Sequence, residues 1–124
     1  MKRKLLFILV LILCLSAIAK DKHISNIESS KNWVYLYDER GNKIKILSKS
    51  DIGQVVGWSA YFFISKKGSW YYFFDVMGKK YKTMSANDVG SIIAVAGETF
   101  TSRNGNWIYT WDKNGKKLKT RSAL

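Results

Sequence analysis

Proline is absent from this 124-residue chain, and cysteine and histidine occur once each. Cys14 lies in an apolar N-terminal stretch, so the rest of the chain can form no internal disulfide. With His23 as the single histidine, the sequence offers no nucleophile–base pair of the usual type and too few ligands for a structural zinc site. It also lacks a glycine motif that cradles a phosphate. We therefore expect a protein that is not an enzyme and that needs no metal or cofactor.

The first 19 residues have the layout of a secretory signal peptide. Residues 2–4 are basic, residues 5–15 are apolar, and Ala17-Ile18-Ala19 is a small-residue cleavage site. The apolar stretch is short for a membrane-spanning helix, which needs about 20 residues. We expect cleavage after Ala19 and a mature protein that is periplasmic or extracellular.

Two alternatives for this leader stay open. Cys14 could be lipidated, although the bulky Leu13 before it disfavours a lipoprotein signal. The leader could also be retained as an N-terminal anchor. Each alternative changes the mass of the mature chain.

Acidic residues are scarce, and this sets the charge. The whole chain has a formal charge of +12, and residues 20–124 carry 18 Lys and Arg against nine Asp and Glu, or +9. A strongly basic exported protein is attracted to anionic partners such as an anionic glycan, a lipid headgroup or an acidic protein. Nucleic acid is not an expected partner, because an exported chain rarely meets it.

The strongest pattern is a repeat of 37 residues. Comparing residues 70–87 with 107–124 gives ten identities in eighteen positions. The sequence predicts a signal peptide (1–19) followed by one domain (20–124) with three units at about residues 20–50, 51–87 and 88–124. The columns that recur are Trp33, Trp70, Trp107; Tyr35, Tyr72, Tyr109; Asp38, Asp75, Asp112; Gly41, Gly78, Gly115; Lys43, Lys80, Lys117; Lys45, Lys82, Lys119; and Ser48, Ser85, Ser122.

Each full unit is predicted to contain four short antiparallel strands. An apolar run (Val55-Val56 in one unit) and a second strand lead through a glycine turn to the aromatic strand, which ends in Asp-x-x-Gly before the lysine strand. The Asp columns are expected to bond the turn backbone. No window outside the leader has a helical period. The first unit lacks the counterpart of residues 51–56, so one of its strands should be missing and its neighbour uncovered.

Strand alternation suggests how the repeated side chains are placed. It predicts that the two lysines of each unit share one solvated face, and that the Trp column fills the core between units. A functional alternative also stays open, in which these residues bind a ligand: the indoles would stack sugars or cations, and the lysines would bind anions. The candidate binding residues are Lys43, Lys45, Lys80, Lys82, Lys117, Lys119, Trp33, Trp70 and Trp107.

Two family resemblances can be stated. Four strands per unit, with Trp111-Asp112 at the end of the third, resemble a β-propeller blade of the WD-repeat kind, which implies blades around an axis. A β-trefoil is the alternative architecture for three four-stranded units. "GSWYYFFDVMGKKYKTM" (68–84) is similar to choline-binding, cell-wall-binding hairpins, in which aromatic residues hold a quaternary ammonium; here the period is nearly twice as long.

Two functions follow as hypotheses. The first is an exported binding protein of the cell envelope or extracellular space, whose repeated basic and aromatic surface binds an anionic glycan, lipid or acidic protein. The second is an assembly subunit whose incomplete unit is completed by homo-oligomerisation.

Overall fold

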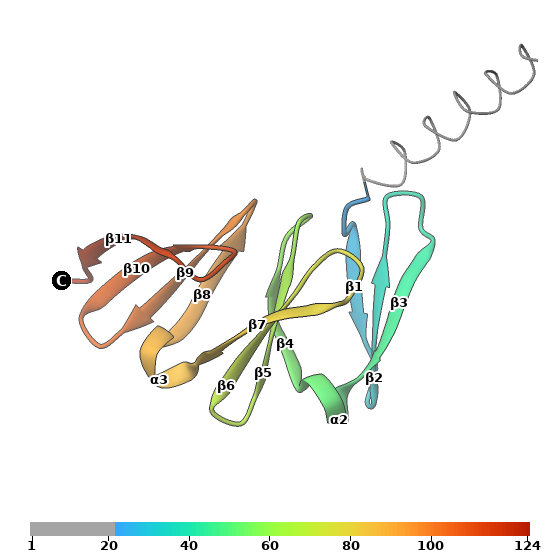
Figure 1. Ribbon diagram of the computed structural model, residues 1–124, viewed down its shortest axis with the longest axis horizontal. Helices are drawn as coiled ribbons and strands as arrows, with labels where there is room; N and C mark the ends of the chain where they lie inside the picture. The colour runs from blue at the N-terminus through green and yellow to red at the C-terminus, as the bar shows by residue number, and fades with distance from the viewer. Residues whose placement is uncertain (1–21) are drawn as a thin grey trace, which may run out of the picture.

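The fold was analysed in a computed structural model that describes residues 22–124; the predicted leader, with Cys14 and its cleavage site, lies outside the described residues. In residues 22–124 the chain forms three antiparallel sheets, joined by two single helical turns. The sheets stand side by side in chain order, with α2 and α3 at the same edge of the molecule (Figure 1). No helix in this part is long and apolar enough to cross a membrane.

We call the three sheets blades 1, 2 and 3. Blade 1 contains β1 (Asn26–Ser29), β2 (Trp33–Tyr37) and β3 (Lys43–Ser48). Blade 2 contains β4 (Gln54–Trp58), β5 (Phe63–Lys67), β6 (Trp70–Phe74) and β7 (Lys80–Ser85). Blade 3 contains β8 (Ser91–Ala96), β9 (Thr99–Asn104), β10 (Trp107–Asp112) and β11 (Lys117–Ser122). Helix α2 (Lys49–Ile52) leads into blade 2, and α3 (Ala86–Val89) leads into blade 3.

The predicted all-β fold of tandem antiparallel repeats is confirmed. Each sheet follows chain order, β1-β2-β3, β4-β5-β6-β7 and β8-β9-β10-β11. Strands pair only within their own sheet, which fits blade-like units and not the shared barrel of a β-trefoil. Blade 1 has three strands, so the prediction of a missing first strand is also confirmed. In blades 2 and 3 the corresponding edges of β5 and β9 are covered by β4 and β8, whereas no strand of residues 22–124 covers this edge of β1.

Two single helical turns, α2 and α3, join the sheets although no window beyond the leader has a helical period. Ser48 and Ser85 cap α2 and α3, since their side chains accept hydrogen bonds from the backbone N–H of Ser50 and Asn87. Gly53 and Gly90 end the two turns with φ of +82° and +88°, a conformation that favours glycine. Four residues are too few to show a helical period, and therefore the hydrophobic pattern could not reveal these turns.

The prediction for the Asp columns is confirmed at every blade. In blade 2, Oδ1 of Asp75 accepts hydrogen bonds from the backbone N–H of Met77 (2.9 Å) and Lys79 (3.0 Å). Asp38 and Asp112 make the same pair of bonds in their own turns. These carboxylates therefore satisfy the β2–β3, β6–β7 and β10–β11 turns.

The core lies between blades, in two separate clusters. One cluster joins blades 1 and 2, and the other joins blades 2 and 3; each contains a stacked aromatic pair, Phe63–Phe74 at 4.6 Å and Phe100–Trp111 at 5.8 Å between ring centres. These pairs are 37 residues apart, so the repeat in the sequence is a repeat of the packing. Blade 2 is consequently covered on both faces, whereas blades 1 and 3 each have one outer face.

Candidate functional site

The Trp columns begin β2, β6 and β10, and they do not fill the core. Trp33, Trp70 and Trp107 are 47%, 50% and 51% exposed, whereas Trp111 is 6% exposed. The prediction that the column packs between units was therefore wrong. Blade-to-blade contact is made farther along each strand, and the indoles lie at the strand ends near α2 and α3, beyond the interblade clusters.

The prediction that both lysines of a unit share one face was also wrong. A β-bulge interrupts each pairing between the aromatic strand and the lysine strand, between Phe73 and Phe74 in blade 2. Because the bulge adds one residue to the lysine strand, Lys80 is opposite Phe74 and Lys82 is opposite Phe73. The two lysines therefore lie on opposite faces. The same irregularity occurs in blades 1 and 3.

The first lysine of each pair is held over a tyrosine of the same blade. The Nζ atom lies 5.0 Å from the ring centre for Lys43 and Tyr35, and 4.4 Å for Lys80 and Tyr72. In blade 3, Lys117 stands 3.8 Å from the centre of the Tyr109 ring. These are cation–π contacts, and all three are in register with the repeat.

The second lysine of each pair turns toward the next blade. A Cβ built on Gly78 would lie 2.8 Å from Cγ of Lys45, and one on Gly115 would lie 2.6 Å from Cε of Lys82. The aliphatic stems of Lys45 and Lys82 thus cover the turn glycine of the following blade, which leaves the ammonium groups at the rim. Lys119, in the last blade, is exposed on β11.

None of these six lysines has an acidic partner among the described residues. The ion pairs within residues 22–124 are His23 Nδ1 with Glu39 at 2.8 Å, and Lys113 with Glu98 at 3.6 Å. The outer strands β3, β7 and β11 therefore present a repeated positive charge. We call each set of one Trp, one Tyr and the first lysine a Trp–Tyr–Lys row; the rows are Trp33, Tyr35, Lys43; Trp70, Tyr72, Lys80; and Trp107, Tyr109, Lys117.

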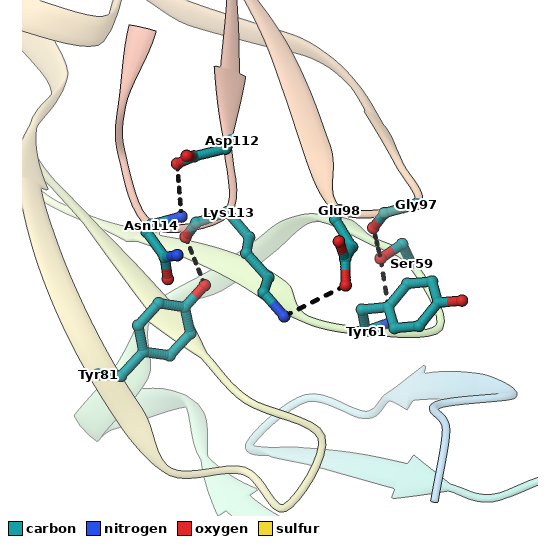
Figure 2. Close-up of polar contacts among 8 residues, drawn as sticks. All are labelled: Ser59, Tyr61, Tyr81, Gly97, Glu98, Asp112, Lys113 and Asn114. Atoms are coloured by element: carbon teal, nitrogen blue, oxygen red, sulfur yellow. Dashed lines mark hydrogen bonds and ion pairs between the residues drawn. The ribbon is translucent and has the colours of Figure 1, made fainter. Parts of the chain in front are cut away.

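A set of polar contacts at the opposite end of the strands fixes blade 3 against blade 2 (Figure 2). The Tyr81 hydroxyl donates to the Lys113 carbonyl at 2.6 Å, and the Ser59 hydroxyl donates to the Gly97 carbonyl at 2.6 Å. Burial of the phenol, together with the charges of Asp75 and Asp112, raises the pKa of Tyr81 to about 12. The hydroxyl therefore stays protonated and donates at neutral pH.

Sequence reasoning missed these contacts for a clear reason. The repeat counterparts of Tyr81 are Ile44 and Leu118, so no column marks this position. The single histidine lies at the same end of the strands, and its ring also contacts Tyr61 edge-on at 5.4 Å between centres. In residues 22–124 no three His, Cys, Asp or Glu side chains are grouped so that they could hold a metal ion.

A groove of about 430 Å³ lies beside the open edge of β1. Its walls come from β1, β4 and β8, and its lining residues are Ile27, Ser29, Val55, Val56, Gly57, Trp58 and Val95. The lining carries no charged side chain, and most of its residues are apolar in type. It is a separate feature from the Trp–Tyr–Lys rows, which end on the outer strands.

Comparison with known proteins supplies no family: no family model and no curated protein matches the chain. Among solved structures, the chain is similar to Hsv2 of Kluyvelomyces marxianus, a β-propeller protein, with a TM-score of 0.48 and 10% sequence identity over 82% of this chain. The chain spans 40% of the length of that structure. The three sheets are blade-like in their own strand pairing and order.

Proposed function

We propose that this protein is an exported, non-enzymatic binding protein of the cell envelope or extracellular space. Its partner is an extended polyanion, an anionic glycan, a lipid surface or an acidic protein, held along β3, β7 and β11. One observation carries the proposal: six lysines recur at the repeat spacing on the outer strands, and none has an acidic partner within residues 22–124.

The arrangement suits a long ligand better than a small one. Each blade offers two ammonium groups, one fixed over a tyrosine and one whose stem lies on the next blade. A surface ion pair contributes about 1 kcal/mol or less, so a single contact binds weakly. Several contacts at fixed spacing add avidity when one chain spans them, and this is how three blades can hold a polymer that one blade would release.

The test is a charge reversal on the outer strands. Replacing Lys80, Lys82, Lys117 and Lys119 by Glu should abolish salt-sensitive binding to polygalacturonate, polyglutamate and phosphatidylglycerol vesicles. Affinity of the unaltered protein should fall as sodium chloride rises, because salt screens exposed charges over about 8–10 Å. Binding is measured by the retarded electrophoretic migration of the protein with each polymer and by light scattering with the vesicles.

A matched variant reverses four cations that lie elsewhere. In this variant Glu replaces Lys22, Lys49, Lys66 and Arg103. The change in net charge is the same, and β7 and β11 are unaltered. It should weaken binding much less. Equal loss in both variants would reduce the proposal to a general effect of net charge, and full binding by the outer-strand variant would refute it.

An assembly role is the second candidate, favoured by the edge of β1 that no strand of residues 22–124 covers and by the groove beside it. An unpaired edge can accept a strand from another chain. Native mass measurement distinguishes the two functions. A stable oligomer that survives the outer-strand reversal supports assembly, and a monomer supports binding alone.

A further inference from the structure

The Trp–Tyr–Lys rows indicate which class of polyanion the protein binds. We infer that each row is a subsite for one acidic sugar of a glycan chain, in which the indole stacks on the sugar ring and the lysine binds its carboxylate or sulfate. This inference rests on the proposed binding of a polyanion along the outer strands. It adds that the ligand is a glycan and assigns the exposed tryptophans a role.

The two ends of a row lie on the same face of one blade. In blade 2, Trp70 and Tyr72 are two residues apart on β6, and Lys80 follows them to that face because of the bulge. Two residues along a strand span about 7 Å, which suits one pyranose ring and its acidic substituent. The bulge that contradicted the sequence prediction is thus what brings indole and ammonium together.

The exposure of the indoles requires a reason that packing does not supply. About half of each side chain faces solvent in all three blades. Within residues 22–124 no acceptor takes a hydrogen bond from their Nε1 atoms. Large apolar side chains that stay half-exposed at every repeat are typical of binding sites, and indoles offer flat area at a low entropic cost.

The lysine of each row determines whether the ligand is an anion or a cation. Aromatic side chains that bind a quaternary ammonium need a free π face, and in these rows an ammonium already occupies the tyrosine, at 3.8 Å from the ring centre in blade 3. The rows therefore repel a cationic ligand such as choline and attract an anion. An acidic peptide or a lipid phosphate would engage the lysine but has no ring to cover the indole, which favours an acidic sugar.

The decisive experiment compares three polymers on the full mature chain. Polygalacturonate offers rings and carboxylates, polyglutamate offers carboxylates without rings, and dextran offers rings without charge. The unaltered protein should bind polygalacturonate best and dextran least. Replacing Trp33, Trp70 and Trp107 together by Ala should weaken polygalacturonate binding by about tenfold or more, and should change polyglutamate binding by about twofold or less.

Two controls keep the result interpretable if the triple variant folds poorly. Trp33→Ala alone alters only the outer face of blade 1, and Trp58→Ala removes a partly exposed indole outside the rows. Polygalacturonate binding should fall with Trp33→Ala and stay unchanged with Trp58→Ala. In the unaltered protein, polygalacturonate should also shift tryptophan fluorescence, and polyglutamate should not.

The failures are distinguishable. The sugar subsite is overturned if the tryptophan variants lose affinity equally for both acidic polymers, or lose none for either. The proposed binding of polyanions by the unaltered protein would still stand. Dextran binding as tight as polygalacturonate binding overturns the role of the lysine. No salt-sensitive binding of any acidic polymer overturns the proposed function and this inference with it.

Discussion

Lys117 Nζ stands 3.8 Å from the centre of the Tyr109 ring, the shortest of the three lysine–tyrosine contacts in the Trp–Tyr–Lys rows. We expect this pair to be coupled in stability. A double-mutant cycle with Lys117→Met and Tyr109→Leu, measured by urea unfolding, should give an interaction of about 0.5–1 kcal/mol. The same cycle on Lys43 and Tyr35, at 5.0 Å, should give less. An interaction near zero in blade 3 would mean that the ammonium is not held over the ring.

The buried hydroxyl of Ser102 links two elements and should matter more than its repeat counterpart. It donates to the Val89 carbonyl at 2.7 Å and accepts from Trp111 Nε1 at 2.9 Å, whereas Ser65 only donates to the Ile52 carbonyl. Ser102→Ala leaves two buried polar groups without a partner, which costs about 1–3 kcal/mol for each group.

Ser65→Ala leaves one such group and is the matched control. Chemical denaturation should therefore rank Ser102→Ala as clearly less stable than Ser65→Ala. Equal losses would show that the indole N–H finds another acceptor.

The glycine that ends α3 should not tolerate replacement by a residue with a side chain. Gly90 has φ of +88°, and a Cβ there would lie 2.3 Å from the Arg103 carbonyl oxygen. Gly90→Ala combines an unfavourable φ, at about 1–2 kcal/mol, with a backbone clash. Gly105→Ala has the same sign of φ but no atom within 4 Å, so it should lose only the conformational part. Thermal unfolding of the two variants separates the terms, and a mild Gly90→Ala would contradict the close approach of α3 to β9.

The repeat made much of this fold predictable. Trp70 and Trp107, or Asp75 and Asp112, stand at the same place in successive blades because one sequence unit makes one sheet. The missing strand of blade 1 followed from the same register. The turns were equally predictable from the sequence, because the Asp side chain accepts hydrogen bonds from the backbone of its own turn.

Three features depended on information that a pattern does not hold. A bulge changes the face of every residue beyond it, so alternation placed Lys80 and Lys82 together when the structure separates them. A Trp in a repeat column can serve the core or the surface, and only the offset between blades decides which. The capped single turns at Ser48 and Ser85 are too short to leave a period.

Tyr81 should make stability depend on pH above 10. Its pKa is raised from 10.0 to about 12 in the folded protein, so the bond to the Lys113 carbonyl is fully present below pH 10. As pH rises from 10 toward 12, the unfolded chain releases the phenol proton first, and the stabilisation is lost. At pH 7, Tyr81→Phe should cost about 0.5–1.5 kcal/mol.

The gap between the unaltered protein and Tyr81→Phe should narrow steadily above pH 10. Urea midpoints at several pH values measure it. Tyr61→Phe removes a hydroxyl that donates no hydrogen bond within residues 22–124, and it should cost little at pH 7. A gap for Tyr81→Phe that widens with pH would contradict the assigned donor role.

The outer face of blade 3 should keep the chain from stacking on further copies through that face. Thr99, Thr101 and Thr110 occupy the positions at which blade 2 has Phe62, Ile64 and Phe73, the residues that pack against blade 3. Polar outer faces are how repeat stacks stay soluble at their ends. Replacing the three threonines by Phe, Ile and Phe should therefore create an apolar face and raise the mass seen by light scattering, in a manner that depends on protein concentration. Replacing Thr83 and Thr120, exposed on β7 and β11 outside this face, by Ile is the control for added apolar surface and should leave the mass unchanged. If both variants associate equally, the threonine positions have no special role in ending the stack.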